Sequence, residues 1–395
     1  MLGKTNINTL TEGTIVTEIK DYKWIQMQSG IFSDFIKAIY KNNYLAAITA
    51  DGKVVYTTDG EVWQVSVLEY KNCKLHDIDF DGSKFIIVGN YMGTRSYSDE
   101  TTGESQVGLI LVTSDFTSYE KKEIVDADGT HKQDFLAVCF RNGKYIFWVY
   151  DRSWSGSTEI WVSDLSDNSY EQKITPQEMP TILDTCSTAK NSQYMILAGG
   201  CGNSNSYSYY TNLVKTDAVA VSILSNKTGD SKNNKTKRIN VFECKDILYY
   251  ISLVKLDNYD FFRILSSGEK ELISSDINYM FVDGVYFNEC QIFINAHEML
   301  VVKKGENVAD KTLDDLIEVA PEHTMNCITK AFGQLYIFGN QGVILKSSVE
   351  TNNEQAIVIQ TLSAKKALVE AKKYADERYA ALDARIAALE ELKGV

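Results

Sequence analysis

Short runs of apolar residues, separated by tight polar turns, recur along most of the chain. The first set is the clearest and comprises FIKAIY (35–40), YLAAIT (44–49), VVYTT (54–58) and VWQVSVL (62–68). Each run is rich in β-branched or aromatic residues, and Gly, Asn or Asp residues separate it from the next. This pattern predicts four antiparallel strands joined by tight turns.

Six weaker copies of this unit follow. Their expected second strands are FIIVG (85–89), YIFWVY (145–150), YMILAGG (194–200), ILYYISLV (247–254), QIFINA (291–296) and LYIFGN (335–340). Successive copies are roughly 49 residues apart, which is a spacing typical of four-stranded repeats. Units stacked around an axis cover each other's faces and leave only short edges. We therefore predict an all-β, seven-bladed β-propeller; six blades are the alternative, because the fifth and sixth copies are degenerate.

The chain divides into three predicted parts. Residues 1–30 form an N-terminal segment, and one extra strand within 14–29 is expected to pair with the last blade and close the ring. Residues 31–362 form the propeller. Residues 363–395 form a coiled-coil oligomerisation helix, because 363–393 is rich in Ala, Leu, Glu and Lys and has no Gly or Pro.

Apolar residues of this helix follow alternating steps of three and four, apart from one gap at Lys372. The residues assigned to oligomerisation are Leu368, Ala375, Tyr379, Leu382, Arg385, Ile386, Leu389 and Glu390. In a parallel coiled coil, Arg385 would face Glu390 of a neighbouring chain.

Three arrangements of the helix follow from its residues. The run from Arg385 to Glu390 resembles the short trimerisation motif of coiled coils, and this favours a parallel trimer. Ile and Leu alternating at the two core positions favour a dimer. A single helix packed on its own propeller, or on another protein, is the remaining alternative.

Composition and charge exclude several classes of protein. The chain has 395 residues, 44% of them hydrophobic, and a net charge of −13, which disfavours phosphate contact and so nucleic-acid binding. It has no apolar run long enough to span a membrane and no visible secretory signal, so we expect no membrane insertion. The seven cysteines are scattered without a CxxC pair, which is typical of a chain made in a reducing compartment.

The segment from Thr57 to Trp63, TTDGEVW, resembles the Asp-box of sialidase-like propellers. Ser114-Asp115 with Tyr119, and Ser163-Asp164 with Tyr170, are similar to degenerate copies. The resemblance implies a structural turn between the outer two strands of a blade, with the Trp packed beneath it.

Sialidase catalysis requires an arginine triad, a Tyr/Glu nucleophile pair and an acidic proton donor. The propeller region has only five arginines, and FRIL (262–265) lacks the Pro of the corresponding family element and lies in mid-chain. We therefore expect that the protein is not an enzyme and has no catalytic residues.

No metal or cofactor is expected. DIDFDG (77–82) matches the opening of a calcium loop, but the position of the bidentate Glu is occupied by Val88, and the alternation predicts an inner strand running into a turn. The four histidines lack zinc-site spacing. Nucleotide-binding glycine motifs and a nucleophile elbow are absent from the sequence.

A binding surface is predicted where long insertions come after the second strand of a blade, at 90–107, 151–158, 200–212 and 255–260. Tyr, Ser, Asn and Gly dominate these segments, as they do in antibody recognition loops. The residues assigned to the ligand-binding face are Tyr97, Arg152, Trp154, Tyr207, Tyr209, Tyr210 and Tyr259. Ordinary surface loops of a Tyr-rich protein are the alternative.

FIKAIYKNNY (35–44) and ITADGKVVYTTDGEVW (48–63) resemble tail propellers of phages from low-GC Gram-positive hosts. A propeller followed by a trimerising helix resembles tail-fibre or baseplate proteins of bacteriophages and of phage-tail-like bacteriocins (tailocins). This resemblance implies a structural and receptor-binding component of a virion or tailocin particle, made in the host cytoplasm.

The resemblance also implies partners. They would be further copies of the chain, with a trimer favoured, other tail or baseplate proteins, and a cell-surface glycan. A glycan-processing enzyme on a sialidase-like propeller and an intracellular scaffold propeller are the alternatives. Acidic residues clustered in a central pocket would favour the enzyme.

Overall fold

The computed structural model describes residues 23–348 except 97–101, 125–131, 152–156, 167–168, 175–184, 203–207, 231–238, 256–257, 266, 268, 278 and 321. The chain divides into two units, one of residues 24–347 and one of residues 1–23 and 348–395. The first unit holds nearly all of the described residues. The eight residues assigned to oligomerisation lie outside the described residues.

The described strands form seven four-stranded antiparallel sheets. In sequence order the sheets comprise β2 (Phe35–Lys41), β3 (Tyr44–Thr49), β4 (Lys53–Thr57) and β5 (Gln64–Val67); β6 (Lys74–Phe80), β7 (Phe85–Ser96), β8 (Thr102–Thr113) and β9 (Glu120–Lys122); β10 (Asp134–Arg141), β11 (Lys144–Asp151), β12 (Ser157–Ser163) and β13 (Glu171–Ile174); β14 (Thr185–Lys190), β15 (Met195–Gly202), β16 (Ser208–Thr216) and β17 (Val221–Asp230); β18 (Ile239–Cys244), β19 (Ile247–Lys255), β20 (Asn258–Ile264) and β21 (Lys270–Ile277); β22 (Asp283–Phe287), β23 (Cys290–Ile294), β24 (Glu298–Lys303) and β25 (Leu316–Glu318); and β26 (Met325–Ala331), β27 (Gln334–Gly339), β28 (Ile344–Ser348) and β1 (Lys23–Met27).

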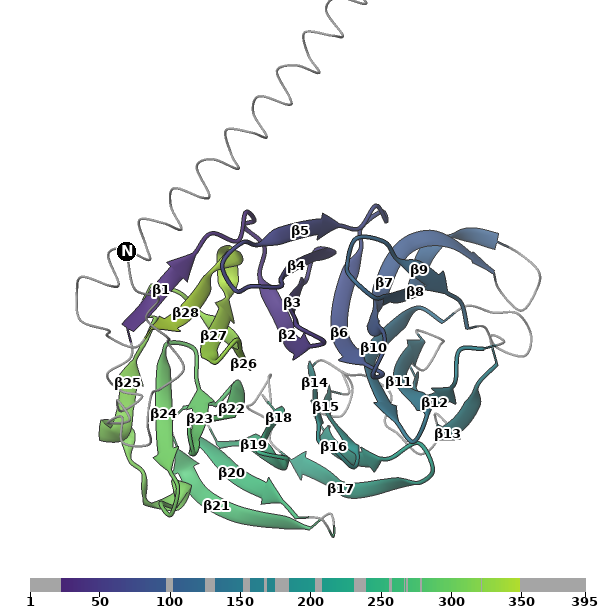
Figure 1. Cartoon of the computed structure of the whole chain (residues 1–395). Helices are drawn as coiled ribbons and strands as arrows, with labels where there is room; N and C mark the ends of the chain where they lie inside the picture. Colours follow the sequence, from purple (N-terminus) through teal and green to yellow (C-terminus); the bar gives the residue numbers. More distant parts are fainter. Residues whose placement is uncertain are drawn as a thin grey trace, which may run out of the picture. The chain divides into compact units, whose positions relative to one another are not determined.

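The sheets are arranged around a central axis, with the first strand of each sheet innermost (Figure 1). Each innermost strand contacts the innermost strands of the two neighbouring sheets, and β26 contacts both β22 and β2, so the ring is closed. The fold is therefore an all-β propeller. Three short 3₁₀ helices, Val308–Asp310, Leu313–Asp315 and Asn340–Gly342, complete the regular structure of the described part.

All seven of the second strands expected from the sequence are present. The first, β3, covers the expected 44–49, and the others differ from expectation mainly at their ends. The extra strand expected within 14–29 is β1, which is hydrogen-bonded to β28 as the outer strand of the last sheet. The ring is thus closed by strands from the two ends of the propeller, which needs no covalent link.

One face of the ring carries the turns between the first and second strands, of which five have two residues and two, 81–84 and 191–194, have four. Five of these turns have both central residues at positive φ: Asn42-Asn43, Asn142-Gly143, Lys245-Asp246, Asn288-Glu289 and Phe332-Gly333. Positive φ at both positions defines the type I′ turn, whose twist matches that of the flanking strands. We call this the tight-turn face.

On the opposite face, here the hairpin face, the second strands β7, β15 and β19 continue beyond the last residue that each pairs with the first strand of its sheet. The β7–β8 ladder extends to the pair Ser96↔Thr102, and the β15–β16 ladder extends to Gly202↔Tyr209. The expectation that 90–107 and 200–212 are loops was therefore wrong for most of their length. Backbone hydrogen bonds form a ladder without apolar side chains, so polar Tyr-, Ser- and Gly-rich segments can extend a hairpin beyond the core.

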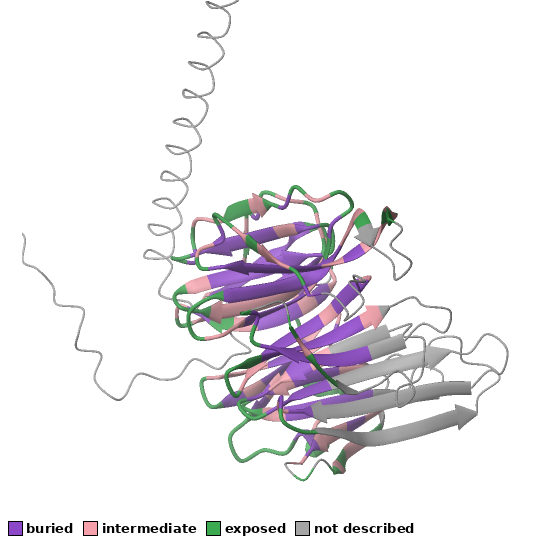
Figure 2. Ribbon diagram, turned by 90° about the vertical axis from the view of Figure 1, so that its right-hand side faces the viewer, coloured by how far each residue is buried: buried purple, intermediate pink, exposed green. Residues whose placement is uncertain are grey.

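The core lies between neighbouring sheets, where large side chains from facing strands pack together. Figure 2 shows the buried residues along these strands. Trp148, Trp161 and Tyr336 are among its largest fully buried side chains. Each sheet thus supplies one half of two interfaces, and the packing holds the inner strands in place around the axis.

Candidate functional site

The Asp-box segment forms the turn between β4 and β5. The Thr57 hydroxyl donates to Asp59 Oδ1 (3.0 Å) and accepts from the Gly60 N–H (3.0 Å). Asp59 Oδ1 also accepts from the N–H groups of Glu61 (2.8 Å) and Val62 (2.9 Å). The Trp63 ring packs edge-on against Phe338 of the adjoining sheet. The box is a structural turn at the tight-turn face, as its resemblance implied.

The same turn recurs between the third and fourth strands of the next three sheets. Asp115, Asp164 and Asp217 each accept, at Oδ1, a bond of 2.9 Å from the N–H two residues further on. The sequence pointed to the first two of these and missed the third, Thr216-Asp217, because no aromatic residue follows it closely. A Ser or Thr before the Asp is the signal that all four turns share.

The residue after each of these aspartates has positive φ: Gly60 (74°), Phe116 (62°), Leu165 (60°) and Ala218 (75°). Three of the four therefore carry a Cβ in the left-handed region, and these three side chains are buried. The turn itself tolerates a side chain at this position, so Gly60 is required by its neighbours and not by the turn.

The residues assigned to a ligand-binding face have different outcomes. Tyr97, Arg152, Trp154 and Tyr207 lie outside the described residues. Tyr259 is 6% exposed and belongs to the core between the sheets of β18–β21 and β22–β25, so its assignment to a binding face was wrong. An aromatic residue at the start of a third strand can point into the packing between sheets, and the sequence alone does not show which way it points.

Tyr209 and Tyr210 lie on the extended part of β16. Their backbones pair with Gly202 and Cys201 on one side, and with Gly229 and Thr228 on the other. These two residues are therefore brought to the hairpin face, within a three-stranded ladder.

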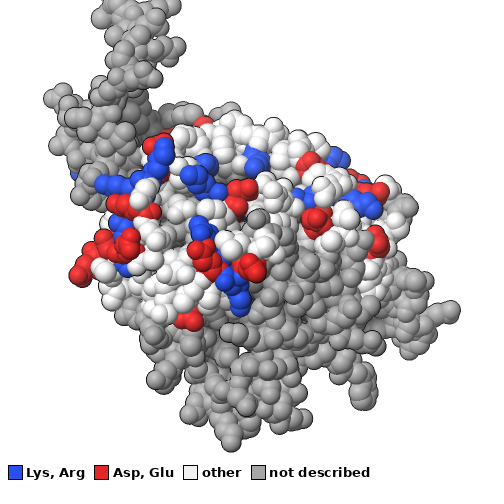
Figure 3. All heavy atoms as spheres, turned by 90° about the horizontal axis from the view of Figure 1, so that it is seen from below, with Lys and Arg blue, Asp and Glu red and all other residues white. Residues whose placement is uncertain are grey.

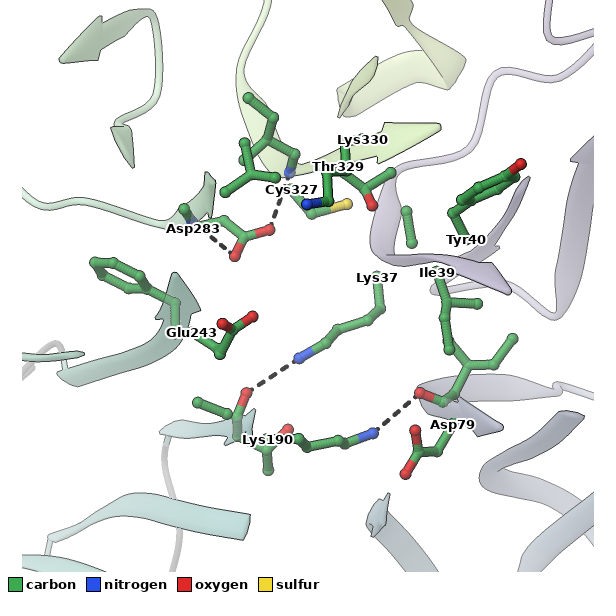
Figure 4. Close-up of a pocket in the computed structure, with 18 of the residues that line it drawn as sticks. Lys37, Ile39, Tyr40, Asp79, Lys190, Glu243, Asp283, Cys327, Thr329 and Lys330 are labelled. Atoms are coloured by element: carbon green, nitrogen blue, oxygen red, sulfur yellow. Dashed lines mark hydrogen bonds between the residues drawn. The ribbon is translucent and has the colours of Figure 1, made fainter. Parts of the chain in front are cut away.

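A cavity of about 1410 Å³ occupies the centre of the ring. Residues of all seven innermost strands line it, together with residues 191–192, 245–246 and 332–333 of the turns between first and second strands. The cavity therefore reaches the tight-turn face. Figure 4 shows charged side chains from several strands pointing into it.

Two lysines extend across the cavity. Lys190 of β14 forms an ion pair with Asp77 of β6 (Nζ–Oδ2 2.7 Å) and donates to the Ile78 carbonyl (3.0 Å). Lys37 of β2 donates to the Thr188 carbonyl of β14 (3.0 Å; Figure 4). Burial alone would lower the pKa of Lys190, but the nearby Asp77 and Asp79 carboxylates outweigh it, so this pKa is raised and the amine stays charged.

Carboxylates of the innermost strands bind the backbone of the neighbouring sheet. Asp77 accepts from the Val138 N–H (3.0 Å) and Asp79 accepts from the Phe140 N–H (2.8 Å), which links β6 to β10. Asp77-Ile78-Asp79 is thus an inner strand with Ile78 buried, as the alternation predicted. Hydrogen bonds of this kind replace direct strand pairing between sheets.

Asp283 repeats this arrangement between β22 and β26. Its carboxylate accepts from the N–H groups of Ile328 (2.9 Å) and Gly284 (2.8 Å). Burial raises the pKa of Asp283 to about 6, while the Lys37 amine and the two backbone donors act in the opposite direction.

Glu243 of β18 is the second cavity carboxyl with an altered acidity. Burial raises its pKa, the nearby Asp283 and Asp246 carboxylates raise it further, and Lys330 opposes them. Glu243 also accepts a hydrogen bond from the Asp246 N–H. The sequence did not point to Glu243 or Asp283; each follows a stretch without a recognisable motif, and only ring closure brings them to one cavity.

A histidine completes the titratable lining. His76 Nε2 lies 3.1 Å from Asp134 Oδ2 and 3.0 Å from Asn90 Nδ2. Among the described residues, no three His, Cys, Asp or Glu side chains are grouped so that they could hold a metal ion.

Basic and acidic side chains are interspersed over the part of the molecule seen in Figure 3. No helix among the described residues has the length and apolar character needed to cross a membrane.

The comparisons with known proteins show the fold and no family. No protein-family model matches the chain, and no curated protein matches it in sequence. A catalytically inactive variant of virginiamycin B lyase from Staphylococcus aureus, solved with quinupristin, is similar in structure, with a TM-score of 0.52 and 8% identity over 83% of this chain and 99% of that one.

Two further propellers are similar at lower TM-scores. BamB from Moraxella catarrhalis has a TM-score of 0.45 and 12% identity over 83% of this chain and 98% of that one. The WD40 β-propeller domain of Doa1 has a TM-score of 0.47 and 11% identity over 84% of this chain and 97% of that one. The 8% identity with the lyase, whose TM-score is 0.52, shows the fold alone and no particular activity.

Proposed function

We propose that this propeller is a non-enzymatic structural and receptor-binding component of a phage or tailocin tail. One observation carries the proposal: the two faces of the ring differ. The hairpins β7–β8, β15–β16 and β19–β20 extend beyond the first strands of their sheets, whereas the first turns and the Asp-turns on the other face are short. The tight-turn face has one long connection, 304–315, but the extended hairpins all lie on the other face, as expected of a scaffold that presents a recognition surface.

The hairpin face would contact the partner through its Tyr-rich extensions, including Tyr209 and Tyr210 of β16. Aromatic rings offer contact area at a low entropic cost, and they suit both sugars and protein surfaces. The partner is a host-surface glycan or a neighbouring tail protein. The tail assignment itself rests on the resemblance of 35–44 and 48–63 to tail propellers.

Residues 363–395 would gather three copies of the chain into a stalk. Three weak sites on one particle can raise the overall affinity by orders of magnitude without any new contact. The particle would be a virion or tailocin, and the stalk or propeller would contact other tail or baseplate proteins.

The tail assignment is tested on purified particles. Antibodies against the propeller are expected to label the tail in electron micrographs and to detect the chain in the particle's protein profile. Particles from a strain that lacks the gene serve as the control. Absence of the chain from otherwise complete particles would refute the tail assignment.

The oligomer is tested on the full chain by light scattering. The wild-type chain is expected to have three times the monomer mass, and Ile386→Asp is expected to reduce it to one. Ala384→Asp, which changes charge outside the predicted apolar seam, is the matched control. A monomeric wild-type chain, or an Ile386→Asp trimer, would refute the stalk.

A glycan-processing enzyme is the second candidate, because Glu243 and Asp283 line one cavity and both have raised pKa values. Against it, each carboxyl already accepts backbone hydrogen bonds that account for its position. Hydrolysis of host-surface glycans that is lost in Glu243→Gln and kept in Glu271→Gln, a surface control on β21, would favour the enzyme over the proposal.

A further inference from the structure

The central cavity has more basic than acidic groups, although the whole chain has a net charge of −13. Six basic side chains line it, against the four acidic ones Asp79, Glu243, Asp246 and Asp283. Three of the six, Lys37 and Lys41 of β2 and Lys330 of β26, come from adjacent innermost strands. Half of the basic side chains therefore lie on one arc of the wall, and the other three, Arg141, Lys190 and Lys245, come from the rest of the ring.

The amines of the three lysines on this arc have unused hydrogen-bond donors. Lys41 and Lys330 are exposed and form no ion pair with another described residue. Lys37 donates one hydrogen bond, to the Thr188 carbonyl, and an ammonium group has three donors. This arc can therefore donate several bonds to a ligand without breaking any bond of the fold.

The acidic groups of the cavity are engaged within the protein. Asp79 and Asp283 accept from backbone N–H groups of the neighbouring sheets, and Asp246 accepts from the N–H and hydroxyl of Ser192 (both 2.6 Å). Glu243 accepts from the Asp246 N–H. These bonds hold the carboxylates in place, and the lysines of the arc supply the donors for a ligand in the cavity.

Aromatic rings line the same end of the cavity. They are half-buried, and they stand at the ends of innermost strands or in the turns that come next: Tyr40, Phe80, Tyr286, Phe287 and Phe332. Four of these rings also pack against the core between sheets, and the exposed part of each, beside polar donors, is suited to a sugar ring, which has an apolar face and a hydroxyl edge. The volume, about 1410 Å³, exceeds that of the roughly 300–1,000 Å³ pockets that hold drug-sized ligands.

We propose that the central cavity binds an anionic saccharide, which enters from the tight-turn face and places its carboxylate or phosphate against Lys37, Lys41 and Lys330. The aromatic rim packs on the sugar ring. This site lies on the face opposite the long hairpins, so the inference stands whether or not the tail assignment holds.

The test is titration calorimetry of the full chain with three monosaccharides that differ in charge. D-Glucuronate is expected to bind saturably with a dissociation constant of about 1 mM, and D-glucose at least about tenfold more weakly. Added salt should weaken the glucuronate binding, because the interaction is electrostatic. D-Glucosamine, which carries a positive charge, should bind no better than glucose.

Two lysine substitutions identify the site. Lys41→Gln with Lys330→Gln is expected to weaken glucuronate binding about tenfold, with an unchanged melting temperature, because neither side chain takes part in packing. Lys304→Gln is the matched control: Lys304 lies near the same face, outside the cavity lining, in an exposed pair with Glu289.

Four results would overturn the proposal. They are no saturable glucuronate binding, equal binding of glucuronate and glucose, tighter binding of glucosamine, or full affinity in the folded Lys41→Gln/Lys330→Gln chain. The last would place an anion site elsewhere on the molecule.

Discussion

Replacement of Gly60 by alanine tests whether the Asp-box glycine is required by packing between sheets. Gly60 has φ of 74°, and a Cβ there would overlap Tyr336 Oη and approach Phe332 Cδ2 to 2.9 Å. Both neighbours belong to the last sheet. The left-handed backbone costs an alanine about 1 kcal/mol, and displacement of well-packed aromatic rings costs about 2 kcal/mol more. We expect Gly60→Ala to lower the free energy of unfolding by about 3 kcal/mol.

Gly143→Ala is the matched control. Gly143 has nearly the same φ, 76°, but a Cβ there would meet no heavy atom within 4 Å. Gly143→Ala is therefore expected to lower the free energy of unfolding by about 1 kcal/mol, the cost of the left-handed backbone conformation alone. The difference between the two variants isolates the contact with Tyr336 and Phe332.

Urea unfolding followed by tryptophan fluorescence measures both variants. A shift of the midpoint at constant slope reports the change in the free energy of unfolding. Tyr336→Phe in the Gly60→Ala background removes the overlapping oxygen and should restore about 1 kcal/mol, as a coupled pair does in a double-mutant cycle. Equal losses of unfolding free energy in Gly60→Ala and Gly143→Ala would show that packing does not require the glycine. The same conclusion would follow if Tyr336→Phe restored no stability to Gly60→Ala.

Three further predictions concern the inner strands and the turns. The folded-state pKa of Asp283, about 6, lies above its ordinary 3.8, so the folded chain binds more protons between these pH values, and the contribution of Asp283 to the free energy of unfolding should fall by about 2 kcal/mol as pH rises through this window. Urea titrations at pH 4 and 8 should therefore differ between wild type and Asp283→Asn by about this amount, and an identical pH dependence of the two chains would contradict the prediction. Lys190→Met should lower the free energy of unfolding by about 3 kcal/mol, because it leaves the Asp77 carboxylate, 1% exposed, without its counter-charge. Lys304→Met, which breaks an exposed pair, should lower it by less than about 0.5 kcal/mol. Equal losses would show that the buried pair does not stabilise the fold. Asp217→Ala removes a side-chain acceptor of backbone N–H groups, as the loss of a helix N-cap does, and should lower the free energy of unfolding by about 1 kcal/mol. The melting temperature should fall accordingly, and an unchanged melting temperature would mean that the fourth turn does not depend on its Asp.

The repeated strand pattern was readable from the sequence because each strand is defined locally. YLAAIT (44–49) is apolar throughout, is bounded by turn residues, and forms β3 over those residues. The Asn-Asn and Asp-Gly pairs likewise specify turns through their own backbone preferences. The propeller class, the ring-closing role of β1 and three of the four Asp-turns are predictable from such local signals.

The long hairpins show where local signals fail. Segments such as 90–107 lack the apolar alternation of a half-buried strand, because beyond the ring they have no core to face. Their pairing depends on the backbone ladder that continues from β7 and β8, which the side-chain pattern does not record. The burial of Tyr259 was unreadable for a related reason, since the direction of a side chain depends on its register in the sheet.

A repeat of four-stranded units can be derived from the amino-acid order alone, because strands and tight turns are specified by neighbouring residues. The set of polar residues that meet at the centre depends instead on how the sheets are placed in space. Lys37 and Thr188 are 151 positions apart, and Asp283 and Ile328 are 45 apart. Such contacts depend on how whole sheets are placed around the axis, and packing between the sheets determines that placement. The residue pattern of a single strand does not contain this information.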